Sequence, residues 1–156
     1  FSAIRFNFRG VGKSQGVYDD GEGELSDAAS VLDWLQQYNT NSKICWVAGF
    51  SFGAWVAMQL LMRRPEINGF VNISPPANLR DFSFLAPCPS SGLIVHGDKD
   101  NIASFDSSKI LAEKLQKQKK VDIKFKPIKG ADHFYENYTE ELSNIVESYI
   151  KDSLKS

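Results

Sequence analysis

The chain of 156 residues is 42% hydrophobic and 24% charged, and its formal net charge is −1 at pH 7. These values are ordinary for one globular domain, and the balanced charge excludes an electrostatic surface for nucleic acid or an anionic membrane. No apolar run approaches the roughly 20 residues that cross a bilayer. We therefore expect a single cytoplasmic domain over residues 1–156, with neither nucleic acid nor a membrane as its partner.

Five segments have the length and the residue types of β-strands. The expected strands cover residues 3–8, 44–48, 69–73, 93–96 and 122–127. The middle three are continuous apolar runs, as in parallel strands that are covered on both faces. The last alternates Ile123 and Phe125 with Lys124 and Lys126, which predicts a strand near the edge of the sheet.

Helices are expected between these strands, because apolar residues recur there at helical spacing. Ser26 is the expected N-cap of a first helix that ends at Gln37, and Thr139 is the expected cap of a terminal helix. The residues expected to be buried by these two helices are Ala28, Val31, Leu32 and Leu35, and Leu142, Ile145, Val146, Tyr149 and Ile150; Ile110, Leu111 and Leu115 mark a further helix. The alternation predicts an α/β fold, a mostly parallel sheet with helices on both faces.

The pentapeptide Gly49-Phe50-Ser51-Phe52-Gly53 lies between an apolar run of strand length and one of helix length. This context favours a strand–turn–helix elbow that exposes the Ser51 hydroxyl near a helix N-terminus, where backbone N–H groups favour negative charge. Gly49 and Gly53 are expected there because a Cβ atom at either position would collide with the backbone of the turn. A glycine-flanked turn without catalytic function is the alternative reading of the same pattern.

A serine nucleophile requires a base, and the base requires an orienting acid. The chain has two histidines, His96 at the end of an apolar strand and His133 in the segment after the last strand. Only His133 leaves room for an acid between serine and histidine in the chain order Ser, Asp, His. His133 is therefore the candidate base, His96 is a structural residue, and spacing leaves Asp98 and Asp100 as nearly equal candidates for the acid.

Four motifs in this order give the chain a resemblance to the α/β-hydrolase superfamily, specifically to lidless bacterial serine esterases and the dienelactone-hydrolase-like group. Residues 9–14 resemble the R-G-x-G-x-S loop, residues 49–53 the nucleophile elbow, residues 96–100 the H-G-x-x-D acid turn, and residues 130–134 the histidine loop. This resemblance selects Asp100 over Asp98. Dienelactone hydrolases use cysteine where this chain has Ser51, so their lactone chemistry is not implied.

The resemblance implies a catalytic triad of Ser51, Asp100 and His133, with the Phe52 N–H in the oxyanion hole. It also implies that the fold lacks its first strands, because the sequence opens at Phe1 within an expected strand and without an initiator methionine. Family members carry earlier strands and a loop that donates the second oxyanion N–H. Residues 74–91 are too few for a lid domain, so we expect an open site.

The expected reaction is hydrolysis of a small-molecule ester or thioester through an acyl-enzyme, with no metal and no organic cofactor. Phe50, Pro75 and Phe134 are the candidate substrate-binding residues. The wall of an apolar acyl pocket would also include Phe52, Pro76, Phe82 and Phe84, of which Phe82 and Phe84 are at least as readily explained as core. Rival readings are a non-catalytic binding module and an acyltransferase or peptidase with the same triad; the sequence leaves the oligomeric state open.

Two other segments have features of ligand sites. Residues 10–14 resemble the end of a phosphate-binding P-loop, but Asn7 occupies the position of its leading glycine, and turn residues follow where a helix should begin. The acidic residues 19–24 lack the spacing of a calcium-binding loop. Cys45 and Cys88 are expected as free thiols, not as a disulfide or a metal site.

Overall fold

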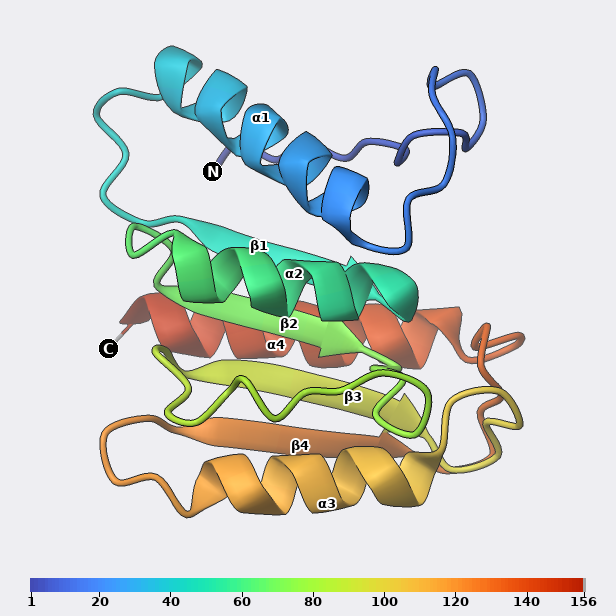
Figure 1. Cartoon of the computed structure of the whole chain (residues 1–156). Coiled ribbons are helices and arrows are strands. Elements are labelled where there is room, and N and C mark those ends of the chain that lie inside the picture. Colours follow the sequence, from blue (N-terminus) through green and yellow to red (C-terminus); the bar gives the residue numbers. More distant parts are fainter. Residues whose placement is uncertain (156) are drawn as a thin grey trace.

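The computed structural model describes residues 1–155, which form a four-stranded sheet beneath and between helices (Figure 1). Its strands are β1 (Trp46–Phe50), β2 (Gly69–Ile73), β3 (Gly92–Gly97) and β4 (Ile123–Ile128). They lie in the order β1-β2-β3-β4, and each pairs in parallel with the next. Because parallel neighbours need crossover connections, every strand is followed by a helix or a long loop. The predicted α/β class is confirmed.

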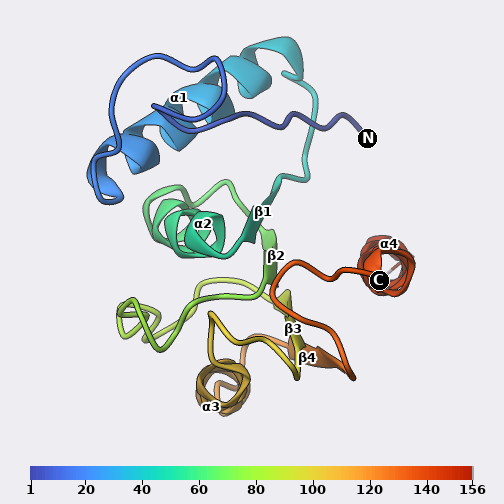
Figure 2. The same ribbon diagram turned by 90° about the vertical axis from the view of Figure 1, so that its right-hand side faces the viewer.

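Helices cover both faces of the sheet (Figure 2). They are α1 (Glu22–Tyr38), α2 (Phe52–Arg63), α3 (Phe105–Gln116) and α4 (Thr139–Lys155). Helices α2 and α3 lie on one face and α4 lies on the other, while α1 packs on the outer side of α2. Residues 74–91, between β2 and β3, contain neither a helix nor a strand, so no lid is inserted there.

The core has two parts, because successive side chains of a strand point to opposite faces. Phe70 and Ile94 pack towards α2 and α3, whereas Val71, Leu93 and Val95 pack on the α4 side. Strand β4 is an edge strand, as its alternating lysines predicted: Ile123 is buried while Lys124 and Lys126 are exposed. The structure therefore places the apolar strands β2 and β3 in the middle of the described sheet.

The strand predicted over residues 3–8 is wrong. Residues 1–8 have no regular secondary structure, and this segment runs beside α1 and away from β1 (Figure 2). A strand is stabilised by a neighbour that completes its backbone hydrogen bonds, and no strand of the described residues 1–155 lies next to this segment. Hydrophobicity alone predicted the strand, but only Phe8 of these residues becomes half-buried.

The predicted N-cap Ser26 is also wrong, because α1 begins one turn earlier. Gly21 is the N-cap, with a φ of 102° that favours glycine, and Ser26 lies inside the helix. The buried carboxylate of Glu24 accepts hydrogen bonds from the N–H groups of Asp19 and Gly21 at 3.0 and 3.1 Å. The bond from the Gly21 N–H is the one that an N3 glutamate accepts from the N-cap residue in a capping box, so the helix starts at Glu22.

Candidate active site

Ser51 lies on a sharp turn between β1 and α2. Its φ of 53° and ψ of −119° are unusual for a residue with a side chain, and strain of this kind is found mainly at functional sites. The Ser51 N–H donates to the Ile73 carbonyl at 2.8 Å, which fixes the turn to the end of β2. Phe52 is the first residue of α2, so its N–H has no acceptor within the helix and remains available above the turn.

The two glycines of the elbow differ in what they allow. A Cβ atom on Gly49 would overlap the Gly53 carbonyl and lie 2.6 Å from the Ala54 nitrogen, so the turn closes only with glycine there. A Cβ atom on Gly53 would lie 3.7 Å from the Phe8 ring, an ordinary contact. The predicted collision is thus found at Gly49 and is wrong for Gly53.

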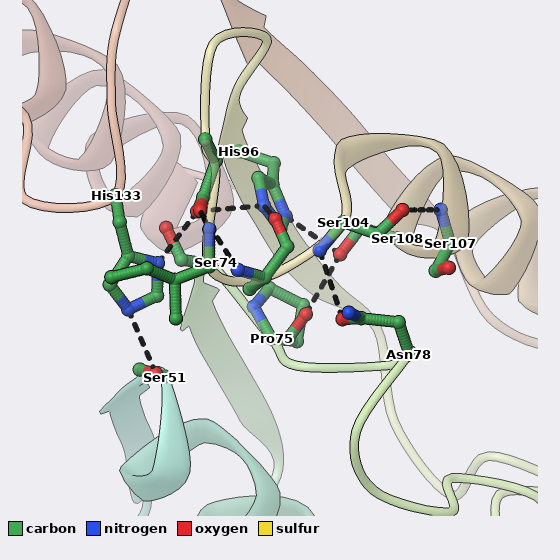
Figure 3. Close-up of polar contacts among 12 residues, drawn as sticks. Ser51, Ser74, Pro75, Asn78, His96, Ser104, Ser107, Ser108 and His133 are labelled. Atoms are coloured by element: carbon green, nitrogen blue, oxygen red, sulfur yellow. Dashed lines mark hydrogen bonds and ion pairs between the residues drawn. The ribbon is translucent and has the colours of Figure 1, made fainter.

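The structure brings Ser51, His133 and Asp100 together from three different loops, and Figure 3 shows the His133 ring directed at Ser51. His133 Nε2 lies 3.0 Å from Ser51 Oγ, and His133 Nδ1 lies 2.6 Å from Asp100 Oδ2. His133 is 4% exposed and the Asp100 side chain is fully buried. Such an arrangement can remove the serine proton through one imidazole nitrogen while the carboxylate holds the other nitrogen.

The Asp100 carboxylate is held by four donors. Oδ1 accepts from the N–H groups of Ile102 and Ala103, both at 2.8 Å, and Oδ2 lies 2.6 Å from His133 Nδ1 and 3.1 Å from His96 Nε2. Burial by itself would raise the pKa of Asp100, but the hydrogen bonds from His133 and the two backbone groups lower it below its usual value. The carboxylate therefore stays ionised at neutral pH.

The other two sequence candidates of this region have different positions. Asp98 is exposed and accepts a hydrogen bond from the Gly130 N–H at 2.7 Å, so it ties the acid turn to the histidine loop without touching His133 Nδ1. His96 is fully buried at the end of β3. Sequence reasoning assigned it a structural role only and missed that it contacts Asp100.

Of the expected pocket residues, two aromatic rings border His133. The Phe50 and Phe134 rings both lie 5.1 Å from the imidazole and 6.1 Å from each other, and they are 41% and 66% exposed. Pro75 is instead buried, and its carbonyl oxygen lies 3.0 Å from the Ser108 hydroxyl. The exposed rings of Phe50 and Phe134 are therefore the apolar surfaces nearest to the base.

The remaining aromatic candidates point away from His133 or into the core. The Phe52 ring contacts Phe8, Tyr18 and Trp55 at centroid distances of 5.7, 5.7 and 6.0 Å. Phe82 is a core residue and Phe84 is half-buried against the same core, in agreement with their alternative reading. Pro76 is buried as well.

Two contacts near the site had no sequence signal. Ser108 of α3 lies 2.7 Å from His96 Nδ1, and Tyr135 lies 2.7 Å from Ser74, hydroxyl to hydroxyl, directly behind the histidine loop. Ser74 and Tyr135 both have positive φ values, 51° and 57°. Serine and tyrosine are common residues without a motif here, so only the fold shows that these pairs meet.

The alternative ligand sites gain no support from the geometry. No helix begins at Lys13 or Ser14; the next helix starts at Glu22, so a P-loop is not formed. Within residues 1–155, no group of three His, Cys, Asp or Glu side chains is placed to hold a metal ion. Cys45 and Cys88 are free thiols. A hollow between α4 and the sheet has a volume of about 1160 Å³ and is lined by Trp46, Leu93 and Tyr149 among others, but not by Ser51, Asp100 or His133.

Fold and site geometry together define a class: a parallel sheet with a strand–turn–helix serine and no lid is an α/β serine hydrolase arrangement. A model of the X-Pro dipeptidyl-peptidase (S15) family matches residues 1–151. The chain therefore belongs to this family and has the α/β-hydrolase fold.

Solved structures agree with this class. A candidate α/β hydrolase of unknown function from Agrobacterium tumefaciens is 56% identical, with a TM-score of 0.94, covering 97% of this chain and 69% of its own. A serine hydrolase without a lid from Xanthomonas campestris is 31% identical, with a TM-score of 0.82, covering 95% and 65%. An alpha-beta serine hydrolase homologue from Coxiella burnetii is 36% identical, with a TM-score of 0.79, covering 90% and 65%.

A curated relative is similar along most of this chain. It is the uncharacterized protein RP471 of Rickettsia prowazekii (strain Madrid E), 53% identical over 154 residues. The match includes 96% of this chain and 65% of that relative, so the chain spans about two thirds of the relative's length. Among the described residues, no helix is both long and apolar enough to span a membrane.

Proposed function

We propose that the protein is a serine hydrolase that cleaves an ester or thioester through an acyl-enzyme intermediate. The observation that carries the proposal is the continuous path from Ser51 Oγ to His133 Nε2 at 3.0 Å and from His133 Nδ1 to Asp100 Oδ2 at 2.6 Å. Both distances lie within hydrogen-bond range for a nucleophile, its base and an orienting acid. The histidine loop and the acid turn meet Ser51 only because they follow neighbouring strand ends.

In the proposed acylation step, Ser51 Oγ attacks the carbonyl carbon while its proton passes to His133 Nε2. Asp100, kept ionised by hydrogen bonds from His133 and two backbone N–H groups, accepts a hydrogen bond from Nδ1–H and stabilises the resulting imidazolium. The imidazolium then returns the proton to the leaving alkoxide or thiolate as the carbonyl–heteroatom bond breaks. Water repeats the sequence on the acyl-enzyme, with its proton passing to His133 and then to Ser51 Oγ, and the acid product leaves.

The developing oxyanion is assigned to the Phe52 N–H. This group follows the nucleophile directly and lies at the N-terminus of α2, where the helix dipole favours negative charge. The fixed turn holds this N–H before substrate arrives, so no reorganisation is needed as charge develops. The family resemblance implies a second N–H donor to the oxyanion, and none of the four motifs of this chain supplies it.

The substrate class is inferred from the rings beside the base. Phe50 and Phe134 present exposed aromatic rings beside His133, adjacent to each other, so the acyl or leaving group nearest the base is expected to be apolar. With no lid over the site, small and soluble esters can enter directly. A cytoplasmic location is part of the proposal and accords with two free thiols.

A peptidase is the second candidate, because the matching family is described as an X-Pro dipeptidyl-peptidase. An amide demands more from the same site than an ester, since His133 must protonate a poorer leaving group. An acyltransferase differs only in the acceptor of the acyl group. A non-catalytic binding module is the least favoured reading, because it gives no reason for the strained Ser51 turn beside an imidazole.

The test uses a fluorophosphonate probe, p-nitrophenyl esters of increasing chain length, a thioester, and an X-Pro p-nitroanilide. We expect the probe to label Ser51, ester turnover to exceed anilide turnover, and Ser51→Ala to abolish both labelling and turnover. Ser83→Ala, which changes an exposed serine elsewhere, is the matched control. Anilide turnover above ester turnover would favour the peptidase, and an unlabelled Ser51 would favour the binding module.

A further inference from the structure

We propose that His96 is a positioning residue, whose Nε2–H fixes Asp100 in the orientation that His133 requires. This inference rests on the proposed function, because it assigns Asp100 as the acid of the triad. The observation is that two imidazoles meet one carboxylate oxygen: Asp100 Oδ2 lies 2.6 Å from His133 Nδ1 and 3.1 Å from His96 Nε2. Figure 3 shows His96 beside His133 and farther from Ser51 than His133 is.

The His96 side chain is held in place by burial and by hydrogen bonds. It is fully buried, and its Nε2 also lies 2.9 Å from the Ala103 carbonyl. The Ala103 N–H in turn donates to Asp100 Oδ1 at 2.8 Å. The His96 N–H, the Ala103 peptide group and the Asp100 carboxylate therefore form a closed set of bonds that prevents rotation of the carboxylate.

The neighbours of His96 assign its hydrogen. Both groups near Nε2 are acceptors, the carboxylate and the Ala103 carbonyl, so Nε2 carries the hydrogen, and the two oxygens share it in a three-centre hydrogen bond. Nδ1 faces the Ser108 hydroxyl at 2.7 Å, which can donate to it. Burial lowers the pKa of His96, which keeps the ring neutral and leaves Nδ1 as an acceptor.

The Ser108 hydroxyl can point its hydrogen at either of two acceptors. Its hydroxyl lies within reach of both His96 Nδ1 and the Pro75 carbonyl, at 2.7 and 3.0 Å, and its single hydrogen can serve one of them at a time. With the neutral ring it donates to Nδ1 and thereby fixes the tautomer that places the hydrogen on Nε2. Ser108 therefore holds His96, and His96 holds Asp100.

The test compares two replacements of similar size. His96→Gln keeps an N–H donor near the Nε2 position, whereas His96→Met keeps the volume but has no donor. A hydrogen bond to an ionised group is worth enough that its loss corresponds to about a ten- to hundredfold lower kcat. We expect this loss for His96→Met, with KM little changed, and we expect His96→Gln to retain most of the turnover. Equal activity of the two variants would overturn the proposal.

A second readout does not depend on any substrate. The proton between His133 Nδ1 and Asp100 Oδ2 lies in a short hydrogen bond and should give a downfield proton NMR signal, easily assigned in a chain with two histidines. We expect this signal to move or exchange rapidly in His96→Met and to remain near its original position in His96→Gln. An unmoved signal in His96→Met would overturn the proposal even if the variant were slow.

The two readouts separate the two hypotheses. A shifted signal without turnover on any substrate would leave the His96 contact established and the proposed hydrolase function wrong. Turnover that is unchanged in His96→Met would support the hydrolase function and overturn the role of His96. If His96→Met does not fold, Ser108→Ala replaces it, with Ser107→Ala of the same helix as control. We expect Ser108→Ala to move the signal and lower kcat, and a Ser108→Ala protein that behaves like Ser107→Ala would overturn the proposal.

Discussion

The two sides of Ser51 are built in different ways. On the side of the acid and base, a buried carboxylate has four hydrogen-bond donors, with His96 at the end of β3 and His133 in the loop after β4. On the side of Phe52, the ring contacts other rings and the Arg80 guanidinium, and residues 1–20 have no helix or strand. The first side is fixed by buried directional bonds at strand ends, and the second by ring packing and exposed polar contacts of Arg80.

This difference indicates where precision is required. Hydrogen bonds fix both distance and angle, so the acid and base side can hold reacting groups within a narrow range. Ring contacts tolerate sliding and tilting, as the interplanar angles of 83° and 54° between Phe52 and its neighbours illustrate. We therefore expect substitutions on the acid and base side to alter chemistry, and those on the Phe52 side to alter local order.

The largest effect is expected at Asp100. Asp100→Asn keeps the shape of the side chain but removes its charge and presents an amide to His133, which favours the wrong tautomer. Turnover should fall by about 10⁴-fold, the loss known for such a change in a serine triad. Steady-state kinetics on the best ester measures it. Asp98→Asn is the control, since Asp98 bonds only the Gly130 N–H, and its loss should be less than tenfold. A larger loss of turnover in Asp98→Asn than in Asp100→Asn would contradict the assignment of Asp100 as the acid.

Much of the acid and base side was accessible from the sequence, because its residues lie within short motifs directly after strands. The chain order Ser, Asp, His identified Ser51 and His133 and limited the acid to Asp98 or Asp100; the structure brings Ser51, Asp100 and His133 together, and their catalytic roles stay predictions. The choice of Asp100 over Asp98 came from the family resemblance. The contacts of His96 and Ser108 were not predictable, because they depend on how α3 lies against β3.

The Phe52 side was predicted poorly for a physical reason. Hydrophobic residues over 3–8 have strand propensity, but a strand forms only beside another strand, and that condition is not visible in the segment itself. Similarly, the buried Glu24 displaced Ser26 as the determinant of the start of α1. Both errors concern segments whose conformation is decided by partners distant in space.

The elbow between the two sides gives the next prediction. Gly49→Ala places a methyl group against the backbone of Gly53 and Ala54, so it should destabilise the fold by about 3 kcal/mol. Gly53→Ala meets only the Phe8 ring at contact distance and should change the free energy of unfolding by less than about 1 kcal/mol. Urea denaturation of both proteins provides the test. If Gly53→Ala is as damaging as Gly49→Ala, the Phe52 side is tighter than we infer.

Tyr135 extends the comparison to stability at high pH. Burial raises the pKa of Tyr135 from 10.0 to about 12, so the unfolded chain loses this proton at lower pH than the folded protein does. The stability that this phenol contributes is therefore full below pH 10 and is lost as the pH rises towards 12, by on the order of 2 kcal/mol. Tyr135→Phe should be less stable at pH 7, through loss of the Ser74 bond, but should show a shallower decline above pH 10.

Denaturant midpoints between pH 7 and pH 11 measure this decline. Tyr38→Phe is the control, because Tyr38 is 70% exposed and its hydroxyl meets water in both states. Equal slopes for the Tyr135→Phe and Tyr38→Phe proteins would show that the hydroxyl pair behind the histidine loop contributes nothing to alkaline stability.

The smallest effect on chemistry is expected at Arg80, on the Phe52 side. Its guanidinium lies 4.6 Å from the Trp55 ring and bonds Asp20 at 2.6 Å and the Tyr18 hydroxyl at 2.8 Å, so it fixes residues 18–20 to α2. Arg80→Ala should accelerate hydrogen exchange in this segment, while ester turnover changes only a few-fold. Arg63→Ala is the control, since Arg63 bonds only the Gln59 carbonyl of its own helix. Among the contacts of the described residues, no bond of Arg80 reaches Ser51, His133 or Asp100. A loss of turnover in Arg80→Ala as large as that in Asp100→Asn would therefore show that the Phe52 side takes part in the chemistry.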